Sequence, residues 1–510
     1  MRHNWGAVRV VALVLLITGM LFGCSGESGG TGGLEQQEAG SAGLPGVNTQ
    51  PETNTNQAAS EVVPNPESLS PIALTGAPPE IGAASETGVQ SLSLSNLCGD
   101  IALGASEVVI PVLPKPALLE PYLDPAFGSR VTRITDSSFG EVSKPMYSTV
   151  QSWNADESYL MLYKTGGSDI GHHLYNGQNY AHIRKLDISP VDLEQVFWSR
   201  SNPDEFFYVS RGSSERGSFR RFSVSANQSE EITNFESQCG SGLPGNGNDV
   251  QMHAVNDDLF GFSCQQDDGH HIMFSYKPST GDIATAPTGT GSPWLPWSAP
   301  VPAASGNRFW HQGHVLANDL VQVNHQLDMD NWYSHASTGM TADGQDAYYQ
   351  TAFNVSPNGC NGDLYQGVGH LIEHNMETGE CRSIISEQQG YPYTTSSTHV
   401  SSLAFNLPAR VAMSSIGRAD QFSHFSNGIA APALLSEVYV AQTTVNDTAV
   451  CRLAHHRSFG KSASNGGYEP YFGEPHATIS PSGTRILFGS DWYDSGSVDT
   501  FVVELPDWNQ

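Results

Sequence analysis

Hydrophobic and polar positions follow one pattern that recurs along most of the chain. Each copy has a run rich in Tyr, Phe, Leu and Val, then a polar turn, then a second apolar run, which is the pattern of a β-hairpin. Further hairpins lie between the copies, such as "HHLYNGQNYAHIRKLDI", where Asn176-Gly177 favours a tight primed turn. The copies occupy residues 150–163, 194–210, 250–264, 333–353, 397–415 and 473–492.

The spacing of the copies predicts the fold class. Intervals of roughly 45 to 80 residues bracket the period of propeller blades, and the hairpins in between complete four strands for each blade. Six copies, with a first strand near "SRVTRIT" and a last strand at "VDTFVVELP", predict an all-β propeller of seven blades, with six blades as the alternative. We expect the first and last strands to share one blade, because this arrangement closes the ring and hides its edges.

The N-terminal part does not follow the hairpin pattern. Residues 1–24 place basic side chains before an apolar run and end at Cys24, the layout of a secretory signal peptide with a lipidation site. The apolar run from Val10 to Phe22 is shorter than the roughly 20 residues that a membrane-spanning helix needs. The sequence therefore predicts an exported lipoprotein, anchored by its lipid in the bacterial envelope, at the outer membrane.

Residues 25–97 are rich in Gly, Ser, Pro, Gln, Thr and Glu and poor in aromatic residues. Such a composition buries too little apolar surface to offset the entropy of ordering, so we predict a disordered tether. The propeller domain is then expected over residues 98–510, which contain nearly all of the Trp and Tyr residues.

Acidic residues greatly outnumber basic ones. The chain has 23 Lys and Arg against 52 Asp and Glu, which gives a net charge of −29. This balance argues against nucleic-acid binding, because neutralising phosphates needs clustered Lys and Arg. A polyanionic substrate would be repelled unless a local cationic patch or a metal ion reversed the sign.

A propeller gathers residues from all of its blades at one face. The innermost strand of each blade starts there, and the loop between its second and third strands returns there. Polar side chains at these points are expected to form a site, although a single His at a strand start can also bond the backbone of the neighbouring blade. At strand starts lie Gln151, Gln195, Gln251, His253, His335, His399 and His476, and in or beside the loops lie His172, His173, Arg211, Arg216, His270, His271 and Cys360.

Three of these residues have side chains that suit a metal ion. His335 and His399 open the inner strands of adjacent blades and Cys360 returns to the same face, a set suited to Zn²⁺ with a fourth ligand unassigned. The alternative is a disulfide between Cys360 and Cys381, because export permits disulfides and an even number of cysteines remains once Cys24 is set aside. No organic cofactor is predicted, because the sequence has no Gly-rich nucleotide-binding motif.

Three stretches carry a resemblance to a known family. "QSWNADESYLMLY", the hairpin "GHHLYNGQNYAHIRKLDI" and the closing "GEPHATISPSGTRILFGSDW" with "VDTFVVEL" resemble the propeller-type polysaccharide lyases, the oligogalacturonate and ulvan lyases. The resemblance implies β-elimination at a uronic acid of an acidic polysaccharide, ulvan-like or pectic. Such a reaction must neutralise the sugar carboxylate, remove the proton beside it and protonate the departing glycosidic oxygen.

The residue types at the expected face match these tasks. We expect His172 or His173 to transfer the proton, because a neutral imidazole acts near pH 7, and Arg211 or Arg216 to bind the carboxylate. The expected substrate-binding residues are Gln151, Gln195, His253, His270 and His271. The alternative to a lyase is a non-catalytic envelope propeller that binds a glycan or a partner protein, and in either case we expect a monomer.

Anchoring is expected to depend on Cys24. A thioether-linked lipid together with an acylated amine supplies the two chains that stable attachment needs. Cys24→Ser should therefore move the protein from the membrane fraction to the soluble fraction after lysis, as followed by immunoblotting. Continued sedimentation of this variant with membranes would contradict a lipid anchor.

Overall fold

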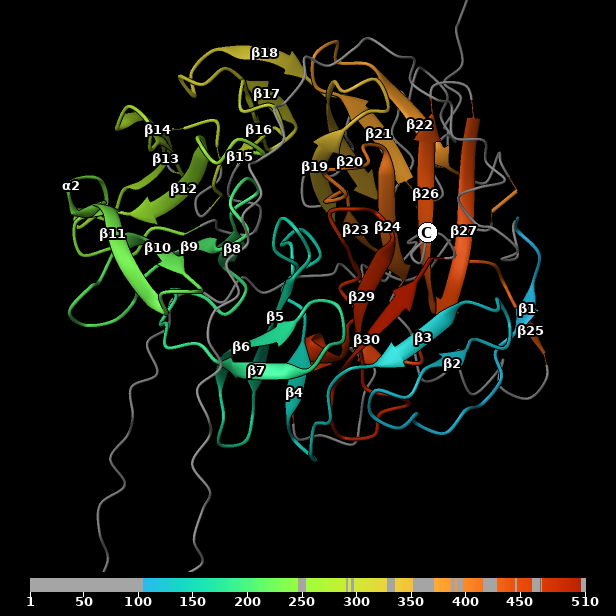
Figure 1. Cartoon of the computed structure of the whole chain (residues 1–510). Helices are drawn as coiled ribbons and strands as arrows, with labels where there is room; N and C mark the ends of the chain where they lie inside the picture. The colour runs from blue at the N-terminus through green and yellow to red at the C-terminus, as the bar shows by residue number, and fades with distance from the viewer. Residues whose placement is uncertain are drawn as a thin grey trace, which may run out of the picture. The chain divides into compact units, whose positions relative to one another are not determined.

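The computed structural model is an all-β propeller (Figure 1). It describes residues 104–505 except 246–253, 290–291, 295–297, 328–334, 352–370, 387–389, 392–397, 416–428, 445–446, 461–467 and 469. The signal sequence, the tether and Cys24 lie outside the described residues, so these remain predictions.

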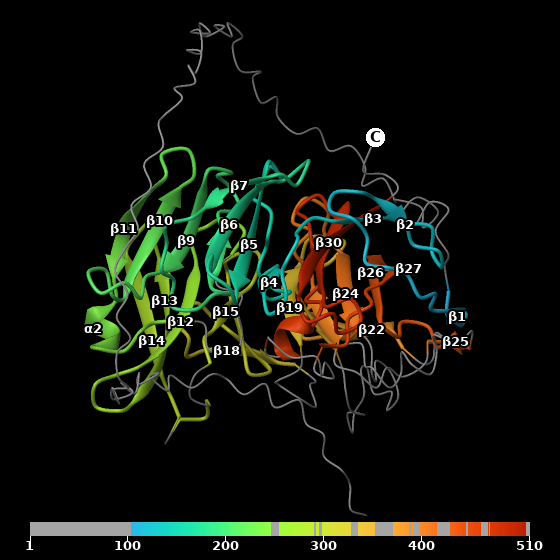
Figure 2. The ribbon, with the colours of Figure 1, turned by 90° about the horizontal axis from the view of Figure 1, so that it is seen from below.

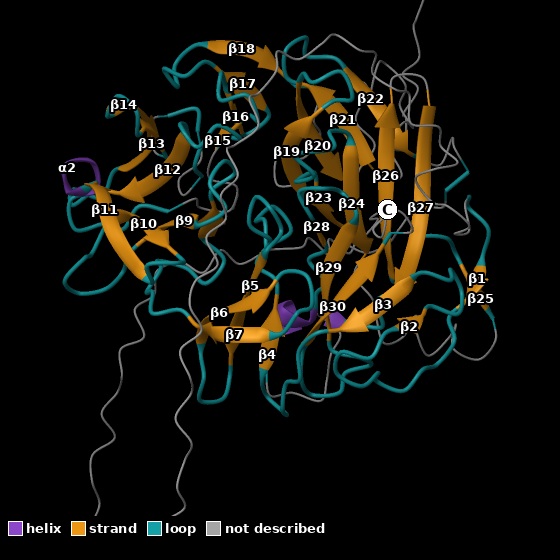
Figure 3. Ribbon diagram, in the orientation of Figure 1, coloured by secondary structure: helices purple, strands orange, loops and turns teal. Residues whose placement is uncertain are grey.

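The described strands form eight sheets, of which seven are blades and one is a two-stranded pair of β1 (Val108–Val109) with β25 (Ala430–Ala431). Figure 3 shows strands and loops in the blades, with helix confined to short turns. Blade 1 consists of β4 (Val142–Lys144), β5 (Tyr159–Thr165), β6 (Gly171–Asn176) and β7 (His182–Lys185), blade 2 of β8 (Val196–Trp198), β9 (Glu205–Val209), β10 (Ser218–Ser223) and β11 (Gln228–Asn234), and blade 3 of β12 (Phe260–Gln265), β13 (His271–Lys277) and β14 (Asp282–Thr288). Blade 4 consists of β15 (Val301–Pro302), β16 (Phe309–His311), β17 (His314–Leu316) and β18 (Val323–Gln326), and blade 5 of β19 (Ala336–Met340), β20 (Asp346–Thr351), β21 (Leu371–Asn375) and β22 (Cys381–Ile385). Blade 6 consists of β23 (Thr398–Ser401), β24 (Arg410–Ser415), β26 (Glu437–Thr444) and β27 (Asp447–His455), and blade 7 of β28 (Thr478–Ile479), β29 (Arg485–Ser490) and β30 (Asp499–Glu504) with β3 (Arg130–Arg133) and β2 (Tyr122–Leu123).

The prediction of seven blades is confirmed, as is the prediction that the two ends of the fold share one blade. In blade 7, β3 pairs antiparallel with β30 from Arg130↔Glu504 to Arg133↔Phe501 (Figure 2). The C-terminal chain therefore supplies the three inner strands and the N-terminal chain supplies the two outer strands. This pairing closes the ring.

Blade 7 also binds blade 1 through buried polar contacts. Thr500 Oγ1 donates to the carbonyl oxygen of Ser143 at 2.8 Å. Arg485 of β29 forms an ion pair with Glu157, which lies in the turn after the inner strand of blade 1. The same guanidinium lies over the ring of Trp153, 5.0 Å from its centroid. The joint holds the beginning of blade 1 against the end of the chain.

The hairpin at Asn176-Gly177 differs from its prediction. The structure has a longer loop over residues 177–181 instead of a two-residue primed turn, and Asn176 Oδ1 accepts the backbone N–H of Gln178 and of Asn179, each at 2.9 Å. Gly177 does not adopt a positive φ; a Cβ atom there would lie 2.2 Å from the carbonyl oxygen of Glu157. Glycine is therefore required by a close approach of two backbones and not by a left-handed turn.

The core of blades 2 and 3 is built from aromatic residues that alternate along their strands. Phe219 lies 4.9 Å from Phe260 and Phe235 lies 5.0 Å from Phe262, measured between ring centroids. A disulfide joins Cys239, in α2 (Glu236–Cys239), to Cys264 of β12. The large buried aromatic area explains how strands of only a few residues form a stable blade interface.

Two ends of the ring can be defined from the inner strands. We call the strand-start face the end where β19, β23 and β28 begin, and the turn face the end where these strands turn into their second strands. In blade 1 the inner strand begins at Val142, because β4 pairs with the end of β5, and it finishes near Trp153, which bridges to Leu160.

Several histidines are buried in the blades as neutral side chains. His374 of β21 is fully buried, its Nε2 donates to Gln350 Oε1 at 3.1 Å, and burial lowers its pKa to about 4. Burial also lowers the pKa of His311 to about 4, against the opposing effect of a bond to Ala299. The pKa values of His374 and His311 are lower in the folded protein than in the unfolded chain. Their contribution to folding stability is therefore fully present above the unfolded-state pKa and is lost as pH falls towards the folded-state pKa.

We predict that His374→Gln weakens the pH dependence of stability. The wild type should lose about 2 kcal/mol more of its free energy of unfolding between pH 7 and pH 5 than the variant, because the unfolded His takes up a proton and glutamine does not. Urea unfolding at the two pH values measures the difference. His325→Gln, on the outer strand β18 where the side chain is partly exposed, is the control. If the difference in unfolding free energy between wild type and variant were the same at both pH values, His374 would not be buried as a neutral group.

Candidate metal centre

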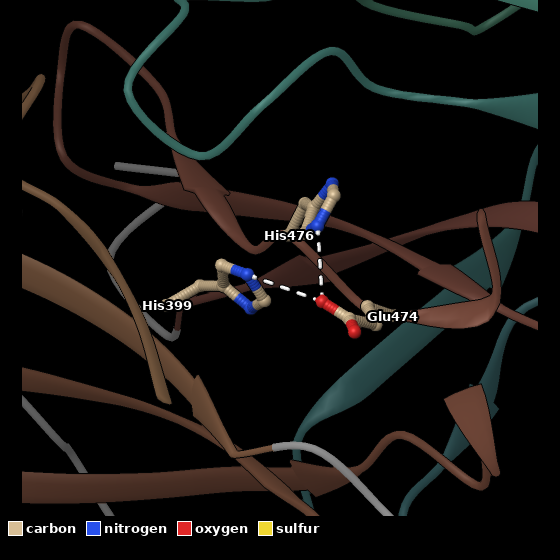
Figure 4. A group of neighbouring side chains, drawn as sticks. All are labelled: His399, Glu474 and His476. Carbon is tan, nitrogen blue, oxygen red and sulfur yellow. Dashed lines mark ion pairs between the residues drawn. The ribbon is translucent and has the colours of Figure 1, made fainter. Parts of the chain in front are cut away.

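Three side chains from two adjacent blades meet at the strand-start face. His399 lies on β23, His476 lies directly before β28, and Glu474 follows the short helix η3 (Pro470–Gly473). Figure 4 shows both imidazoles directed towards the carboxylate of Glu474. Glu474 Oε2 lies 3.4 Å from His399 Nε2 and 3.5 Å from His476 Nε2. All three side chains are buried.

The donor set fits a divalent transition-metal ion. One ligand atom from each residue can be chosen so that all lie within 4.8 Å of one another, and two imidazoles with one carboxylate suit Zn²⁺, Mn²⁺ or Fe²⁺. Without a thiolate the set does not single out zinc. This group, His399 with Glu474 and His476, is called the His-Glu group below.

Two partly exposed residues lie beside the His-Glu group. The ring of His335 stacks on that of His399, with centroids 4.4 Å apart and an interplanar angle of 12°. Tyr147 presents its ring to His399 at 5.4 Å and to His476 at 5.0 Å between centroids. The predicted meeting of His335 with His399 is thus observed, and Tyr147 adds an aromatic side chain from blade 1.

A lysine lies behind the His-Glu group. Lys144, at the end of β4, is fully buried; its Nζ lies 2.9 Å from His476 Nδ1 and donates to the carbonyl oxygen of Glu474 at 3.0 Å. Burial lowers the pKa of Lys144 to about 8, although Glu194 and Glu474 act in the opposite direction. The contact fixes the orientation of the His476 ring, so that its Nε2 faces Glu474.

A second carboxylate completes the surroundings of His476. Glu194 lies two residues before β8, the inner strand of blade 2, and its Oε1 lies 3.8 Å from His476 Nδ1. It accepts the hydroxyl protons of Tyr471 at 2.9 Å and of Tyr163 at 3.3 Å. Burial raises the pKa of Glu194 to about 7, although Lys144 lowers it. Lys144, Glu194 and the three residues of the His-Glu group therefore form one buried polar network.

The network has one basic and two acidic side chains. With Lys144 protonated and both Glu194 and Glu474 ionised, its net charge is negative. A divalent ion held by the His-Glu group would make the net charge positive, which suits an anionic ligand in a protein that is acidic elsewhere.

The remaining predicted metal ligand cannot be placed. Cys360 lies outside the described residues, so its metal or disulfide role stays a prediction. Cys381 and Cys451 are disulfide-bonded. His399 is the predicted ligand that the structure brings into the His-Glu group.

His172 and His173 lie on β6 and are buried. His172 Nε2 donates to the carbonyl oxygen of Leu193 at 2.8 Å, directly before Glu194, and burial lowers its pKa to about 4. His173 Nδ1 lies 3.1 Å from His182 Nε2 on the outer strand. The structure thus gives both rings local partners, and their expected role in proton transfer stays a prediction.

The predicted substrate-binding and carboxylate-binding residues that the structure describes are not members of the His-Glu group. Arg211 and Arg216 are exposed on the loop between β9 and β10, where Arg216 Nη2 donates to the carbonyl oxygen of Ser241 at 3.2 Å. His270 is exposed, and His271 begins β13. Gln195 is buried directly before β8 as expected, whereas Gln251 and His253 lie outside the described residues.

The expectation that Gln151 opens an inner strand is wrong. Its amide nitrogen donates to the carbonyl oxygens of Leu403, at 3.2 Å, and Ile479, at 2.9 Å, which lie at the turn face. The reason is that residues 145–152 separate β4 from Trp153, so the copy recognised in the sequence contains only the far end of this inner strand. Lys144 occupies the strand-start face of blade 1 instead.

Sequence reasoning missed several residues of the network. Glu474 stands two positions before His476, and this Glu-x-His spacing was a usable signal. Lys144 and Glu194 carried no such signal, because each is a single charged residue before or within an apolar strand.

Among the described residues, no helix has the length and apolar character that crossing a membrane requires.

Known proteins resemble this chain in structure and not in sequence. No protein family matches the sequence, and no curated protein is similar to it. An oligogalacturonate lyase in complex with manganese has a similar structure, with a TM-score of 0.52 and 14% identity over 79% of this chain and 99% of that chain. An oligogalacturonate lyase from Vibrio parahaemolyticus has a TM-score of 0.53 and 13% identity over 77% of this chain and 97% of that chain. At such identities the likeness shows the propeller fold alone.

We predict that Glu474→Gln weakens the binding of a divalent ion at least about tenfold, because a neutral amide replaces the only carboxylate of the His-Glu group. Calorimetric titration with Zn²⁺, and the rise in melting temperature on adding it, measure the effect. His325→Ala, on the outer strand β18, is the control. Equal affinity in Glu474→Gln and the wild type would show that the ion binds elsewhere.

Proposed function

We propose that the chain is a metal-dependent polysaccharide lyase that cleaves a uronate-containing polysaccharide of the pectic type by β-elimination. The observation that carries the proposal is the buried His-Glu group at the strand-start face. The oligogalacturonate lyase of similar fold is a complex with manganese, so we propose Mn²⁺ as the ion and an oligogalacturonate as the substrate. Zn²⁺ is the ion expected from the set His335, Cys360 and His399, of which the His-Glu group contains His399.

The described residues have separate tasks in this proposal. When bound, a divalent ion would neutralise the sugar carboxylate and acidify the proton on the neighbouring carbon. His399, Glu474 and His476 would hold the ion, and Lys144 holds the ring of His476 through Nδ1. Burial of these groups excludes water, which strengthens their interaction with an anionic ligand.

Proton transfer requires a group that reaches the substrate. His335 and Tyr147 are partly exposed and lie against the His-Glu group, so both are positioned to exchange a proton with a sugar bound there. His172 and His173, predicted from the sequence, are buried in β6. Position therefore favours His335 and Tyr147, and variants of the two pairs separate the alternatives.

Substrate charge supports a uronate over a more highly charged polymer. With a net charge of −29, the chain repels polyanions at long range, and attraction must come from the loaded His-Glu group. A uronate polymer has one carboxylate on each sugar, which a single metal ion held by the His-Glu group can neutralise. An envelope location, with the expected lipid at Cys24 and a long tether, would place this face where polysaccharide fragments arrive.

We predict that oligogalacturonate incubated with the protein and Mn²⁺ develops near-ultraviolet absorbance, because elimination leaves a double bond conjugated to the carboxylate. Chelation should abolish the signal, and Glu474→Gln should lower the rate at least about 10²-fold through loss of the ion. His325→Ala should leave the rate unchanged. Binding of oligogalacturonate without any new absorbance would instead favour the non-catalytic envelope propeller.

The proton-transfer assignment has its own test. Loss of a general acid or base lowers the rate by roughly 10² to 10⁴ with metal binding intact. We expect this loss for Tyr147→Phe or His335→Gln and a smaller one for His173→Gln. If His173→Gln lost as much rate as expected for Tyr147→Phe, with Mn²⁺ affinity unchanged, His173 would be the proton-transfer group, as predicted from the sequence.

Arg211→Gln and Arg216→Gln test carboxylate binding through a rise in KM.

A further inference from the structure

Two lysines lie on neighbouring strands at the strand-start end of blade 1. Lys164 lies next to the end of β5, Lys185 ends β7, and the intervening strand β6 begins at Gly171, which pairs with Lys164. A Cβ atom on Gly171 would lie 3.1 Å from Cε of Lys185. The side chain of Lys185 therefore lies over Gly171, beside the strand position of Lys164. We call Lys164 and Lys185 the lysine pair.

The charges around the lysine pair differ from those of the chain as a whole. The ammonium group of Lys164 forms no ion pair and no hydrogen bond among the described residues. Lys185 Nζ lies 3.6 Å from Asp169, whose side chain is more than half exposed. A second carboxylate, Glu141, lies against the same β5–β6 loop. Even with both acids counted the charges balance here, whereas the chain has 52 acidic against 23 basic residues.

Positive charge is crowded beside the lysine pair. Desolvation lowers the pKa of His173 and of His182, and the nearby charge of Lys164 lowers the pKa of both side chains further. The chain has six lysines, so placing two of them together in an acidic protein is not explained by overall composition. An anionic ligand would relieve the repulsion.

The lysine pair continues outward from the His-Glu group. Lys164 pairs with Ser143 of β4, and the residue after Ser143 is Lys144, whose Nζ contacts His476. Adjacent strands lie about 4.8 Å apart, so β7 runs roughly 14 Å outward from β4. Ile170, half-exposed in the loop before Gly171, adds an apolar contact for a sugar ring.

We propose that Lys164 and Lys185 bind the carboxylates of the uronate units that follow the one held at the His-Glu group. An acidic chain repels every additional carboxylate of a uronate polymer, so each further unit needs a local cation. An ammonium group on a flexible stem is a point charge that suits the varied carboxylate positions of such a chain. The inference rests on the substrate class of the proposed function and not on its cleavage step.

The first test measures the affinity of the whole protein for a long oligogalacturonate, with a chelator present to prevent turnover. Combined Lys164→Gln and Lys185→Gln should weaken binding roughly threefold to thirtyfold at about 10 mM NaCl. The difference should vanish at about 1 M NaCl, because charges then act over only about 3 Å instead of about 30 Å. Affinity electrophoresis in gels that contain the oligogalacturonate measures both values.

Matched variants locate the effect in the lysine pair. Lys277→Gln removes the same charge from a partly exposed position at the end of β13, and it should change the affinity less than Lys164→Gln does. Asp169→Asn should strengthen binding, because it removes the carboxylate beside Lys185. Wild-type affinity in the double lysine variant, or weaker binding in Asp169→Asn, would overturn the inference.

Kinetics with Mn²⁺ separate this inference from the proposed function. The double lysine variant should raise KM for the long oligogalacturonate by the factor that its affinity falls, with kcat and the KM for digalacturonate unchanged. Lysine-dependent binding without any cleavage would reject the lyase and keep the inference. Cleavage with wild-type KM in the double variant would keep the lyase and overturn the inference.

Discussion

The antiparallel pairing of β3 with β30 is the interaction on which the rest of the structure depends. Each blade contacts only its neighbours, so the inner strands converge on one axis only when the ring is closed. The joint is reinforced by Thr500 with Ser143 and by Arg485 with Glu157. It also brings Lys144, from the first blade, to His476, from the last.

The His-Glu group and its surroundings concentrate buried charge in a fold otherwise packed with apolar side chains. Burying Lys144 and Glu474 costs solvation free energy, which mutual attraction and hydrogen bonds offset only in part. Tyr163 and Tyr471 donate to Glu194 and reduce its cost. Buried charges gathered in this way are typical of functional sites.

The two ends of the inner strands differ in chemistry. At the strand-start face imidazole, carboxylate and ammonium groups from three blades meet, whereas at the turn face the amide of Gln151 donates to the backbone carbonyl oxygens of Leu403 and Ile479. Histidine occurs both in the charged network and as a neutral part of the blades in this chain. His399 lies among charged groups, and His374 is a neutral, hydrogen-bonded part of a blade.

The sequence by itself determined the propeller, with seven blades expected and six as the alternative, the blade shared by both chain ends, and the meeting of His335 with His399. These follow from the hydrophobic period and the polar turns, which are local properties. The tertiary structure alone decided that Lys144 and Glu194 join His476, that Gln151 lies at the opposite face, and that His172 is buried. Local patterns specify strands and turns, but the path of a loop and the closure of the ring decide which charged side chains from distant blades come within a few ångströms.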